Sequence, residues 1–521
     1  MSTIFESRLR TLEGMAGCPY RNGLKGIEKE SLRVSAGGRL ATTPHPPKLG
    51  SALTHPHITT DYSEALLELI TPPYAEYEEL FRFMTDLHTF VYANIDAEIL
   101  WATSMPGNVG RDPDIPIANY GSSNVGRMKT VYRIGLGNRY GRRMQTIAGA
   151  HFNYSFPEAF WKCFRIVCRD SNPLYDFINQ SYFALIRNFQ RTGWIIPYLF
   201  GASTALHNGF IDDTNGFKQF DKNTWFLPYA TSLRMSDVGY KNKAQASLCI
   251  SYNNLDEYIS SLTRAISSPY PDYEKIGVKE GDLYHQLNPN ILQIENEFYS
   301  FVRPKNIAKT GEKPTHALER RGVRYVEIRA LDINLFEPLG LGASESRFLE
   351  AYLISAMLED SPLVSDDELT EINYNQSLVA CRGREPSLSL QRRGSQIALT
   401  EWATEICNQV SAVADYLDSV SGITVYKEAV ERHIAAVKDP EMTPSARVLA
   451  EMRAAGESFI DFALRKSREH AEWFRNRELA PEKLDYFNHA AQASLDEQLE
   501  IEQRDNTDFD TYLERYFSQV I

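Results

Sequence analysis

Polar and apolar residues alternate in several short stretches of the first 360 residues, and this kind of alternation predicts β-strands. One of these stretches is GIEKESLRV, from Gly26 to Val34. Successive strand side chains point to opposite faces, so Glu28 and Glu30 share a face that continues with Leu32. Two carboxylates side by side on such a face are costly unless a cation lies between them. The stretch therefore predicts a strand at a cation site, with a solvated strand face as the alternative.

Two later stretches alternate in the same way. In AGAHFNYSF, His151 and Asn153 lie on a polar face and aromatic residues on the other. In RYVEIRALDIN, Glu327, Arg329 and Leu331 share a face. A lone histidine such as His151 is usually a satisfied core residue, and Glu327 with Arg329 is equally compatible with a cross-strand pair. Both stretches are predicted strands whose polar faces are candidates for a site.

Two more segments complete the predicted sheet. ALLELIT, which ends before Pro72, is interpreted as a strand, and SLCISYNNL as a strand that runs into a helix. Asn254 is the predicted N-cap of that helix, with Glu257 three residues later in a variant of the capping box. Strands and helices do not alternate regularly, so a parallel βαβ sheet is not expected. The pattern favours an α+β fold on an antiparallel sheet.

Residues 361–521 have apolar positions at helical spacing. IALTEWATEICNQVSAVADYLDSVSG predicts a helix that stops at Gly422, and TPSARVLAEMR predicts one with Thr443 as cap and Pro444 at its first position. The acidic final stretch predicts helix with a polar break. We therefore expect an α+β core over residues 1–360 and a mostly helical C-terminal region, residues 361–521, that packs on this core.

Charge narrows the classes of function. The chain of 521 residues carries a net charge of −13, and residues 361–521 contain 29 acidic against 17 basic residues. This balance argues against nucleic acid as a partner. No apolar run approaches the roughly twenty residues of a membrane span, and the charged start lacks a signal-peptide core. The six cysteines form no C-x-x-C pair. We expect a cytoplasmic protein without a membrane partner.

More carboxylates occur in TTDYSEALLELITP. Glu68 falls between Leu66 and Ile70 on one strand face, which suggests burial, although a buried salt bridge would explain it equally well. Asp61 alone is compatible with a simple turn or helix cap. Mg²⁺ prefers about six oxygen ligands. Around more than one ion, these ligands are available from five acidic residues: Glu28, Glu30, Asp61, Glu68 and Glu327.

Nucleotide phosphates, which such ions commonly hold, need positive charge as well. Candidate cations stand in KTVYR, TSLRMSD and FVRPK, and each is an ordinary surface residue by default: Lys129, Arg133, Arg234, Arg303 and Lys305. The usual nucleotide motifs fail. GSSNVGRM has the glycine spacing of a P-loop but Arg-Met in place of Lys-Ser/Thr, and GLGNRYG has one residue too many for the dinucleotide fingerprint.

Eight collinear stretches resemble glutamate–cysteine ligase of the proteobacterial type. They are GIEKESLRV, GSALTHPHITTDYSEALLELITP, LWATSMP, YGSSNVGRMKTVYRIGLGNRYGRRMQTIAGAHFNYS, WIIPYLFGAS, LPYATSLRMSDVGY, LQIENEFYSFVRPK and RYVEIRALDINLFEP. The resemblance runs from about residue 20 to about residue 360 and is looser beyond, where TPSARVL is the best segment. Eight blocks in one order are far more specific than any single short motif.

The resemblance implies a glutamine-synthetase-like curved antiparallel sheet with surrounding helices. It implies ATP-dependent joining of the γ-carboxylate of L-glutamate to the amine of L-cysteine through γ-glutamyl phosphate, the first step of glutathione biosynthesis. Mg²⁺ is the implied metal, with Mn²⁺ as an alternative because imidazole suits softer ions. We expect a monomer that acts on glutamate, cysteine and ATP.

Residue roles carry over position by position. The implied metal-site residues are Glu28, Glu30, Asp61, Glu68, His151 and Glu327. The implied cysteine pocket contains Tyr132, Gln145, Tyr240 and Tyr299. Arg234 and Arg329 fall where glutamate and the transferred phosphoryl group are held, and we add Lys129, Arg133, Arg303 and Lys305 as candidates for the ATP phosphates.

Three other functions stay open on the residues alone. A ligase of the same fold with another amine acceptor would release ADP with a different amino acid. A two-metal hydrolase would release phosphate with water alone, because carboxylates and histidine also serve that chemistry. A non-catalytic nucleotide or metal sensor would bind ATP without turnover.

Overall fold

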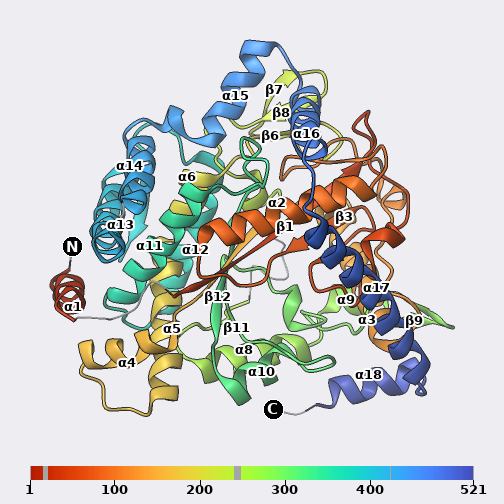
Figure 1. Cartoon of the computed structure of the whole chain (residues 1–521), viewed down its shortest axis with the longest axis horizontal. Helices are drawn as coiled ribbons and strands as arrows, with labels where there is room; N and C mark the ends of the chain where they lie inside the picture. The colour runs from red at the N-terminus through yellow and green to blue at the C-terminus, as the bar shows by residue number, and fades with distance from the viewer. Residues whose placement is uncertain (1, 16–21, 240–247, 423, 520–521) are drawn as a thin grey trace.

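A seven-stranded antiparallel sheet forms the centre of the computed structural model, which describes residues 2–15, 22–239, 248–422 and 424–519 (Figure 1). The strand order is β11-β12-β5-β1-β3-β2, and β4 pairs with the far end of β1. The strands are β1 (Leu24–Val34), β2 (Ile58–Thr60), β3 (Leu66–Ile70), β4 (Ile99–Leu100), β5 (Ala150–Ser155), β11 (Val302–Lys305) and β12 (Tyr325–Leu331). The predicted strands around Glu28, Glu68, His151 and Glu327 are confirmed, and so is the α+β fold.

One face of this sheet is apolar and buried. Ile27 on β1, Phe152 on β5 and Ile328 on β12 are at most 1% exposed. Helix α2 (Tyr77–Asn94) packs on β1 and β3, and its His88 accepts a hydrogen bond from the buried Lys29 at 3.1 Å. Because side chains alternate, the residues between these positions are directed to the opposite, polar face.

Helices surround the sheet in the first 360 residues (Figure 1). They are α1 (Thr3–Glu13), α3 (Asn124–Tyr140), α4 (Glu158–Val167), α5 (Leu174–Thr192), α6 (Ile195–Phe200), α8 (Leu255–Ser267), α9 (Pro271–Ile276), α10 (Pro314–Arg321) and α11 (Ala343–Leu358). Smaller sheets are formed by β6 (Ala205–His207), β7 (Lys218–Asp221) and β8 (Thr224–Phe226), and by β9 (Lys279–Glu280) with β10 (Leu283–Tyr284). In the parts of the chain that the structure describes, no helix combines the length and hydropathy that crossing a membrane requires.

Among the described residues after 360, helices predominate, and the hairpin β13 (Ser389–Arg392) and β14 (Ser395–Ala398) supplies the strands. The helices are α12 (Asp366–Arg382), α13 (Leu399–Ser421), α14 (Val425–Lys438), α15 (Pro444–Ala455), α16 (Phe459–Arg475), α17 (Pro481–Arg504) and α18 (Phe509–Phe517). As predicted, α13 stops at Gly422, whose φ of 68° suits glycine, and the Thr443 side chain caps α15. Helices α16 and α17 pack on α2, and α18 packs on α3 (Figure 1).

The strand predicted in SLCISYNNL is wrong for the described part, residues 248–254. Local side-chain hydrogen bonds replace a strand ladder there: Ser251 Oγ donates to Glu257 at 2.6 Å. The helix prediction is confirmed, because α8 starts at Leu255 and Asn254 Oδ1 accepts from the Glu257 backbone N–H at 2.9 Å.

The predicted alternation of β12 also fails at one point. Ile328 is opposite Phe152, but Leu331 is opposite Ala150, so the strand contains a bulge between these residues. A bulge inserts an extra residue and reverses the faces beyond it. Leu331 therefore turns to the apolar face, where it is 1% exposed, instead of sharing a face with Glu327.

Candidate active site

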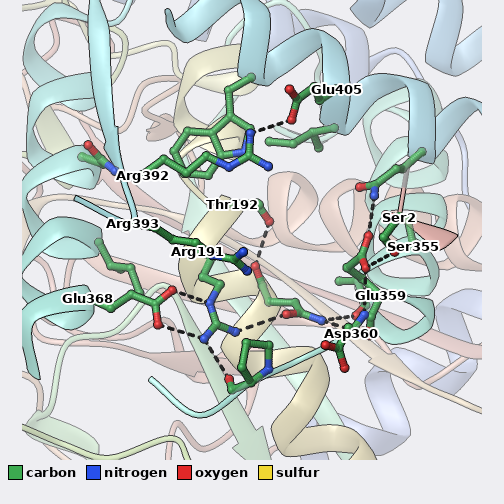
Figure 2. A pocket seen from close by; sticks show the side chains of 18 of the residues that line it. Ser2, Arg191, Thr192, Ser355, Glu359, Asp360, Glu368, Arg392, Arg393 and Glu405 are labelled. Atoms are coloured by element: carbon green, nitrogen blue, oxygen red, sulfur yellow. Dashed lines mark hydrogen bonds and ion pairs between the residues drawn. The ribbon is translucent and has the colours of Figure 1, made fainter. Parts of the chain in front are cut away.

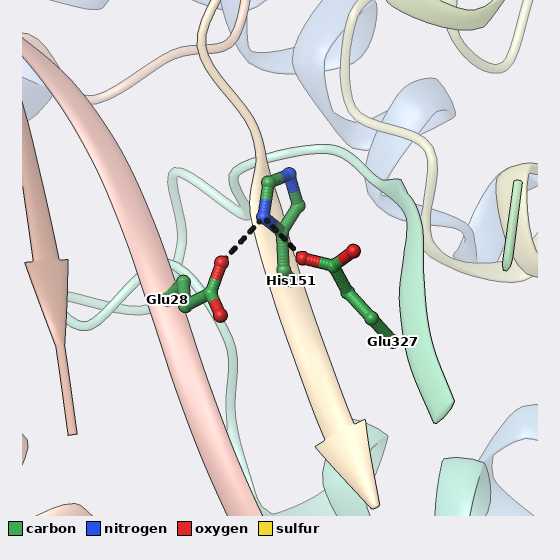
Figure 3. A group of neighbouring side chains, drawn as sticks. All are labelled: Glu28, His151 and Glu327. Carbon is green, nitrogen blue, oxygen red and sulfur yellow. Dashed lines mark hydrogen bonds and ion pairs between the residues drawn. The ribbon is translucent and has the colours of Figure 1, made fainter. Parts of the chain in front are cut away.

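Three side chains from three adjacent strands meet on the polar face of the sheet. Glu28 on β1 is directly opposite His151 on β5, and Glu327 on β12 is opposite Asn153, two residues further along β5. His151 Nδ1 lies 2.9 Å from Glu28 Oε2 and 3.7 Å from Glu327 Oε1 (Figure 3). Ligand atoms of these three residues lie within 4.8 Å of one another, so the group has the spacing of a metal site.

Burial and charge act against each other in this group. Burial and the Glu327 carboxylate raise the pKa of Glu28, but the hydrogen bond to His151, together with the charges of His151 and Lys305, outweighs them and leaves this pKa below its ordinary value. Burial also raises the pKa of Glu327, yet Lys305 and Arg329 hold it well below that value. Both carboxylates are therefore ionised near neutral pH.

A second acidic group lies beside the first. Glu30 on β1 is directly opposite Glu68 on β3, and Glu30 Oε2 accepts a hydrogen bond from the Gly149 backbone N–H at 2.6 Å. Burial and the charge of Asp61 raise the pKa of Glu30. Burial and then Glu28 raise the pKa of Glu68 well above its ordinary range. These carboxyls repel one another unless a positive charge joins them.

The residues fit a divalent cation. His151 Nε2 and Glu327 Oε2 are buried and make no hydrogen bond within the described part of the chain. Asn153 Nδ2 donates to Glu28 Oε1 at 2.9 Å, which orients that carboxylate. A set of carboxylate oxygens suits Mg²⁺, and the imidazole nitrogen also suits Mn²⁺.

Basic side chains border the acidic ones on the β12 side. Arg329 NH1 lies 3.2 Å from Glu327 Oε1, and Lys305 Nζ lies 3.5 Å from Glu327 Oε2. Arg234, in the 3₁₀ turn η4 (Leu233–Met235), is 1% exposed and donates through NH1 to the Arg329 carbonyl at 2.9 Å. Arg303 is opposite Glu327 in the ladder, but its guanidinium donates to the Asn296 and Phe298 carbonyls.

The two predicted cations on α3 lie at the other end, beside Asp61. Arg133 donates through Nε to the Asp61 carbonyl oxygen, and its guanidinium lies 4.5 Å from the centre of the Tyr120 ring. Lys129 Nζ lies 5.1 Å from the same ring centre. Burial and the charge of Arg133 lower the pKa of Lys129 to about 8.

A cavity of about 70 Å³ opens between the acidic group and α3. Glu30, Asp61, Arg133 and Arg329 contribute to its wall, together with the predicted Tyr132, Gln145 and Tyr299. Gln145 Nε2 donates to the Tyr299 hydroxyl at 3.3 Å. The predicted Tyr240 lies outside the described residues.

Sequence reasoning missed several residues at this site. The cavity is also lined by Tyr62, Leu136, Met144, Ile147 and Asn296, which carry no motif. Asn153 could have been found from the sequence, since it shares the predicted polar strand face with His151. Gly149 has none, because its contribution is a backbone N–H.

A larger cavity of about 580 Å³ lies elsewhere, between α5, α11, α12 and α13 (Figure 2). Four of its charged side chains form two ion pairs: Arg191 with Glu368 at 2.6 Å and Arg392 with Glu405 at 2.6 Å. Glu359 accepts hydrogen bonds from Ser2 and Gln409. These internal pairs leave the acidic face of the sheet as the stronger candidate for chemistry.

The site combines clustered carboxylates, a histidine, several cations and a small cavity. Clustered acids that hold divalent ions, with arginines beside them, suit the transfer of a phosphoryl group, in which the protein positions groups and offsets charge.

The chain is similar to known proteins over nearly its whole length. The family model described as glutamate-cysteine ligase matches residues 16–379. A protein from Pseudomonas paraeruginosa named glutamate–cysteine ligase is 48% identical, over 100% of this chain and 99% of its own length. One of the same name from Alcanivorax borkumensis is 49% identical over 98% of this chain and 99% of its own. The crystal structure of a Francisella tularensis glutamate–cysteine ligase in complex with AMP has 38% identity and a TM-score of 0.90, and the match covers 95% of this chain and 97% of that one.

Proposed function

The chain belongs to the glutamate–cysteine ligase family, and we propose that the polar face of its central sheet is the active site. The protein is an ATP-dependent ligase that joins the γ-carboxylate of L-glutamate to the amine of L-cysteine, the first step of glutathione biosynthesis. The observation that carries the assignment of the site is the convergence of Glu28, His151 and Glu327, with Arg329 at 3.2 Å from Glu327.

The chemistry explains why such a face is needed. A carboxylate does not react with an amine in water, so the γ-carboxylate first attacks the terminal phosphorus of ATP and ADP leaves. The resulting γ-glutamyl phosphate is an electrophile, and the cysteine amine attacks its carbonyl carbon. Phosphate leaves and the amine loses a proton. Each step concentrates negative charge on a few oxygens, which positioned cations stabilise.

We propose two groups of metal-site residues that hold Mg²⁺. The first group is formed by Glu28, His151 and Glu327. It is supported by their mutual distances and by the buried His151 Nε2, which makes no hydrogen bond within the described residues. Glu30, Asp61 and Glu68 form the second, supported by the opposed pair Glu30 and Glu68. A bound Mg²⁺ would offset the charge of the ATP phosphates and of the glutamate carboxylate.

The basic residues receive proposed roles by position. Arg234 and Arg329, which meet at the Arg329 carbonyl, would bind the glutamate carboxylate and the phosphoryl group in transfer. Lys305, which is 3.5 Å from Glu327, is proposed at the ATP phosphates. Arg303, Lys129 and Arg133 have the same proposed role, although Arg303 and Arg133 already donate to backbone carbonyls.

We propose that cysteine binds in the cavity lined by Tyr132, Gln145 and Tyr299. Burial and the charge of Glu297 raise the pKa of Tyr132 well above its ordinary value, so its phenol keeps its proton. The apolar Met144 and Ile147 on the same wall suit a thiol side chain. Tyr240 is proposed as a further member.

A coupled assay of ADP release with each substrate omitted in turn tests this function. We expect ADP only when ATP, glutamate and an amine acceptor are all present, with cysteine the best acceptor. ADP release without glutamate would identify a hydrolase, and a better acceptor than cysteine would identify a related ligase. Chelation of divalent cations should stop the reaction.

We also propose a cytoplasmic monomer that acts on small molecules alone, with residues 1–360 as the catalytic core and residues 361–521 packed on it. The packing of α16 and α17 on α2 supports this arrangement. Light scattering during size-exclusion chromatography tests the monomer, since a mass of twice 59.3 kDa would contradict it.

A further inference from the structure

Asp332, just beyond β12, is a buried carboxylate that the proposed chemistry does not use. It is 2% exposed. Its Oδ2 accepts hydrogen bonds from the Ala202 backbone N–H at 2.9 Å and from Ser203 Oγ at 2.6 Å, and its Oδ1 accepts from Ser232 Oγ at 2.7 Å. Burying a carboxylate is costly, so three donors on this one indicate a specific structural task.

The two serines connect Asp332 to the turn that carries Arg234. Ser203 Oγ accepts from the Arg234 backbone N–H at 3.3 Å, and Ser232 Oγ accepts from the Met235 backbone N–H at 3.3 Å. A hydroxyl has one hydrogen to donate. Because Asp332 can only accept, it takes both hydroxyl hydrogens and leaves the serine lone pairs directed to the backbone of η4.

The far end of Arg234 is confined as well. Its NH1 donates to the Arg329 carbonyl at 2.9 Å. A Cβ built on Gly149 would lie 2.1 Å from Arg234 NH2, so the guanidinium lies against the backbone of Gly149. Gly149 in turn donates its N–H to Glu30. The turn and the guanidinium are thus fixed at both ends, beside the acidic group.

We propose that Asp332 is a positioning residue that holds the Arg234 guanidinium in place for the ligase reaction, through Ser203 and Ser232. This inference rests on the role of Arg234 given in the proposed function. Burial raises the pKa of Asp332, and Arg234 with the two serines opposes that rise, which fits a carboxylate oriented toward this turn.

The test is a double-mutant cycle between Asp332→Asn and Arg234→Lys. Asn keeps the shape but has one acceptor oxygen, so at least one serine must turn away. We expect kcat/KM for glutamate to fall about 10- to 100-fold, as small misplacements of catalytic groups do. KM for cysteine should stay within about 2-fold. In the Arg234→Lys background, Asp332→Asn should lower kcat/KM for glutamate by less than about 3-fold, because the effects of two residues that act together do not add.

Asp418→Asn is the matched control. Asp418 is 7% exposed and accepts from the Tyr426 and Lys427 backbone N–H groups at 3.0 and 2.8 Å, far along the chain from the site. We expect it to lower the Tm without changing kcat/KM. Ser203→Ala and Ser232→Ala remove one link each and should change kinetics in the direction of Asp332→Asn, which keeps the test decisive if that variant does not fold.

If Asp332→Asn lowers kcat/KM equally in the wild type and in Arg234→Lys, the inference is overturned, since the effect would then be a general structural one. Wild-type kinetics in both serine variants would overturn it too. Wild-type kinetics in Arg234→Lys would instead refute the proposed role of Arg234, and the inference with it.

Discussion

Glu30 and Glu68 lie directly opposite each other on β1 and β3, with both side chains on the polar face of the sheet. Like charges in such a pair destabilise a sheet, and the charge of Asp61 acts on both carboxyls. The cation-free protein therefore carries a local repulsion that a divalent cation would relieve.

Glu68→Gln should raise the Tm of the metal-free protein at pH 8 by about 0.5 °C, since about 0.5 kcal/mol of repulsion disappears. The same variant should gain less Tm from added Mg²⁺ than the wild type, because it has lost a ligand. Differential scanning calorimetry with chelator and with Mg²⁺ measures both effects. An equal Mg²⁺ shift in the two proteins would exclude Glu68 from the metal site.

Glu327→Ala should lower turnover by at least about 10²-fold, because it removes the acid that pairs with His151, Arg329 and Lys305. We expect the variant to keep its fold. The control is Glu359→Gln in the larger cavity, which should keep full activity. Circular dichroism verifies folding. Near-normal activity of folded Glu327→Ala would refute the metal assignment.

Gly149→Ala should lower kcat/KM for glutamate about 10-fold or more, because the added methyl would lie 2.1 Å from Arg234 NH2 and displace the guanidinium. The exposed Gly37, where a Cβ would meet only Ser35 Oγ at 3.9 Å, provides the matched control Gly37→Ala. Steady-state kinetics on both variants makes the comparison. Unchanged kinetics in Gly149→Ala would show that Arg234 does not act from this position.

Stability should fall as the pH drops from about 6.5 toward 4. Burial, and then the charge of Arg432, lowers the pKa of His433 to about 4, between the rings of Phe200 and Phe348. The unfolded chain binds a proton at His433 near pH 6.5, and the native chain does not. This residue therefore lowers the free energy of unfolding by about 2 kcal/mol when the pH falls from 7.5 to 5.

Urea unfolding at these two pH values measures this loss. The variant His433→Phe should lose less stability on acidification than the wild type by about that 2 kcal/mol. If the two proteins lose the same amount, His433 is protonated in the native state and the argument is wrong.

The ligase should use 2-aminobutyrate slowly in place of cysteine. The cavity wall of Tyr132, Met144 and Tyr299 fits a side chain of this size, and pockets that exclude by shape alone discriminate by about 10- to 200-fold. ADP release with rising 2-aminobutyrate gives kcat/KM directly. The absence of product at high concentration would point to a specific contact with the thiol.

Much of the sheet could be predicted from the sequence, because the alternation of polar and apolar residues that marks a strand is a local pattern. Alternation around Glu28, His151 and Glu327 fixes which side chains share a face, and these three do meet. Caps such as Thr443 depend on neighbouring residues, and they were predicted correctly too.

Other features depend on contacts that no local pattern records. The bulge that turns Leu331 to the apolar face depends on pairing with β5, and the hydrogen bonds of Asp332 join segments 129 and 100 residues away. The strand expected before Asn254 failed because serine and asparagine side chains satisfied the backbone locally. The metal-site and substrate roles stay predictions that the experiments above test.

Lys29 of β1 donates to His88 of α2, and His88 stacks on Phe474 of α16 at 4.9 Å. Phe90 of α2 likewise stacks on Phe487 of α17 at 5.2 Å. Strand β1 and helix α2 are thus supported by helices that a ribosome makes much later. At about 5–20 residues per second, β1 waits on the order of tens of seconds before it gains this support. Chains that end before α16 and α17 lack this support, and we expect them to be inert.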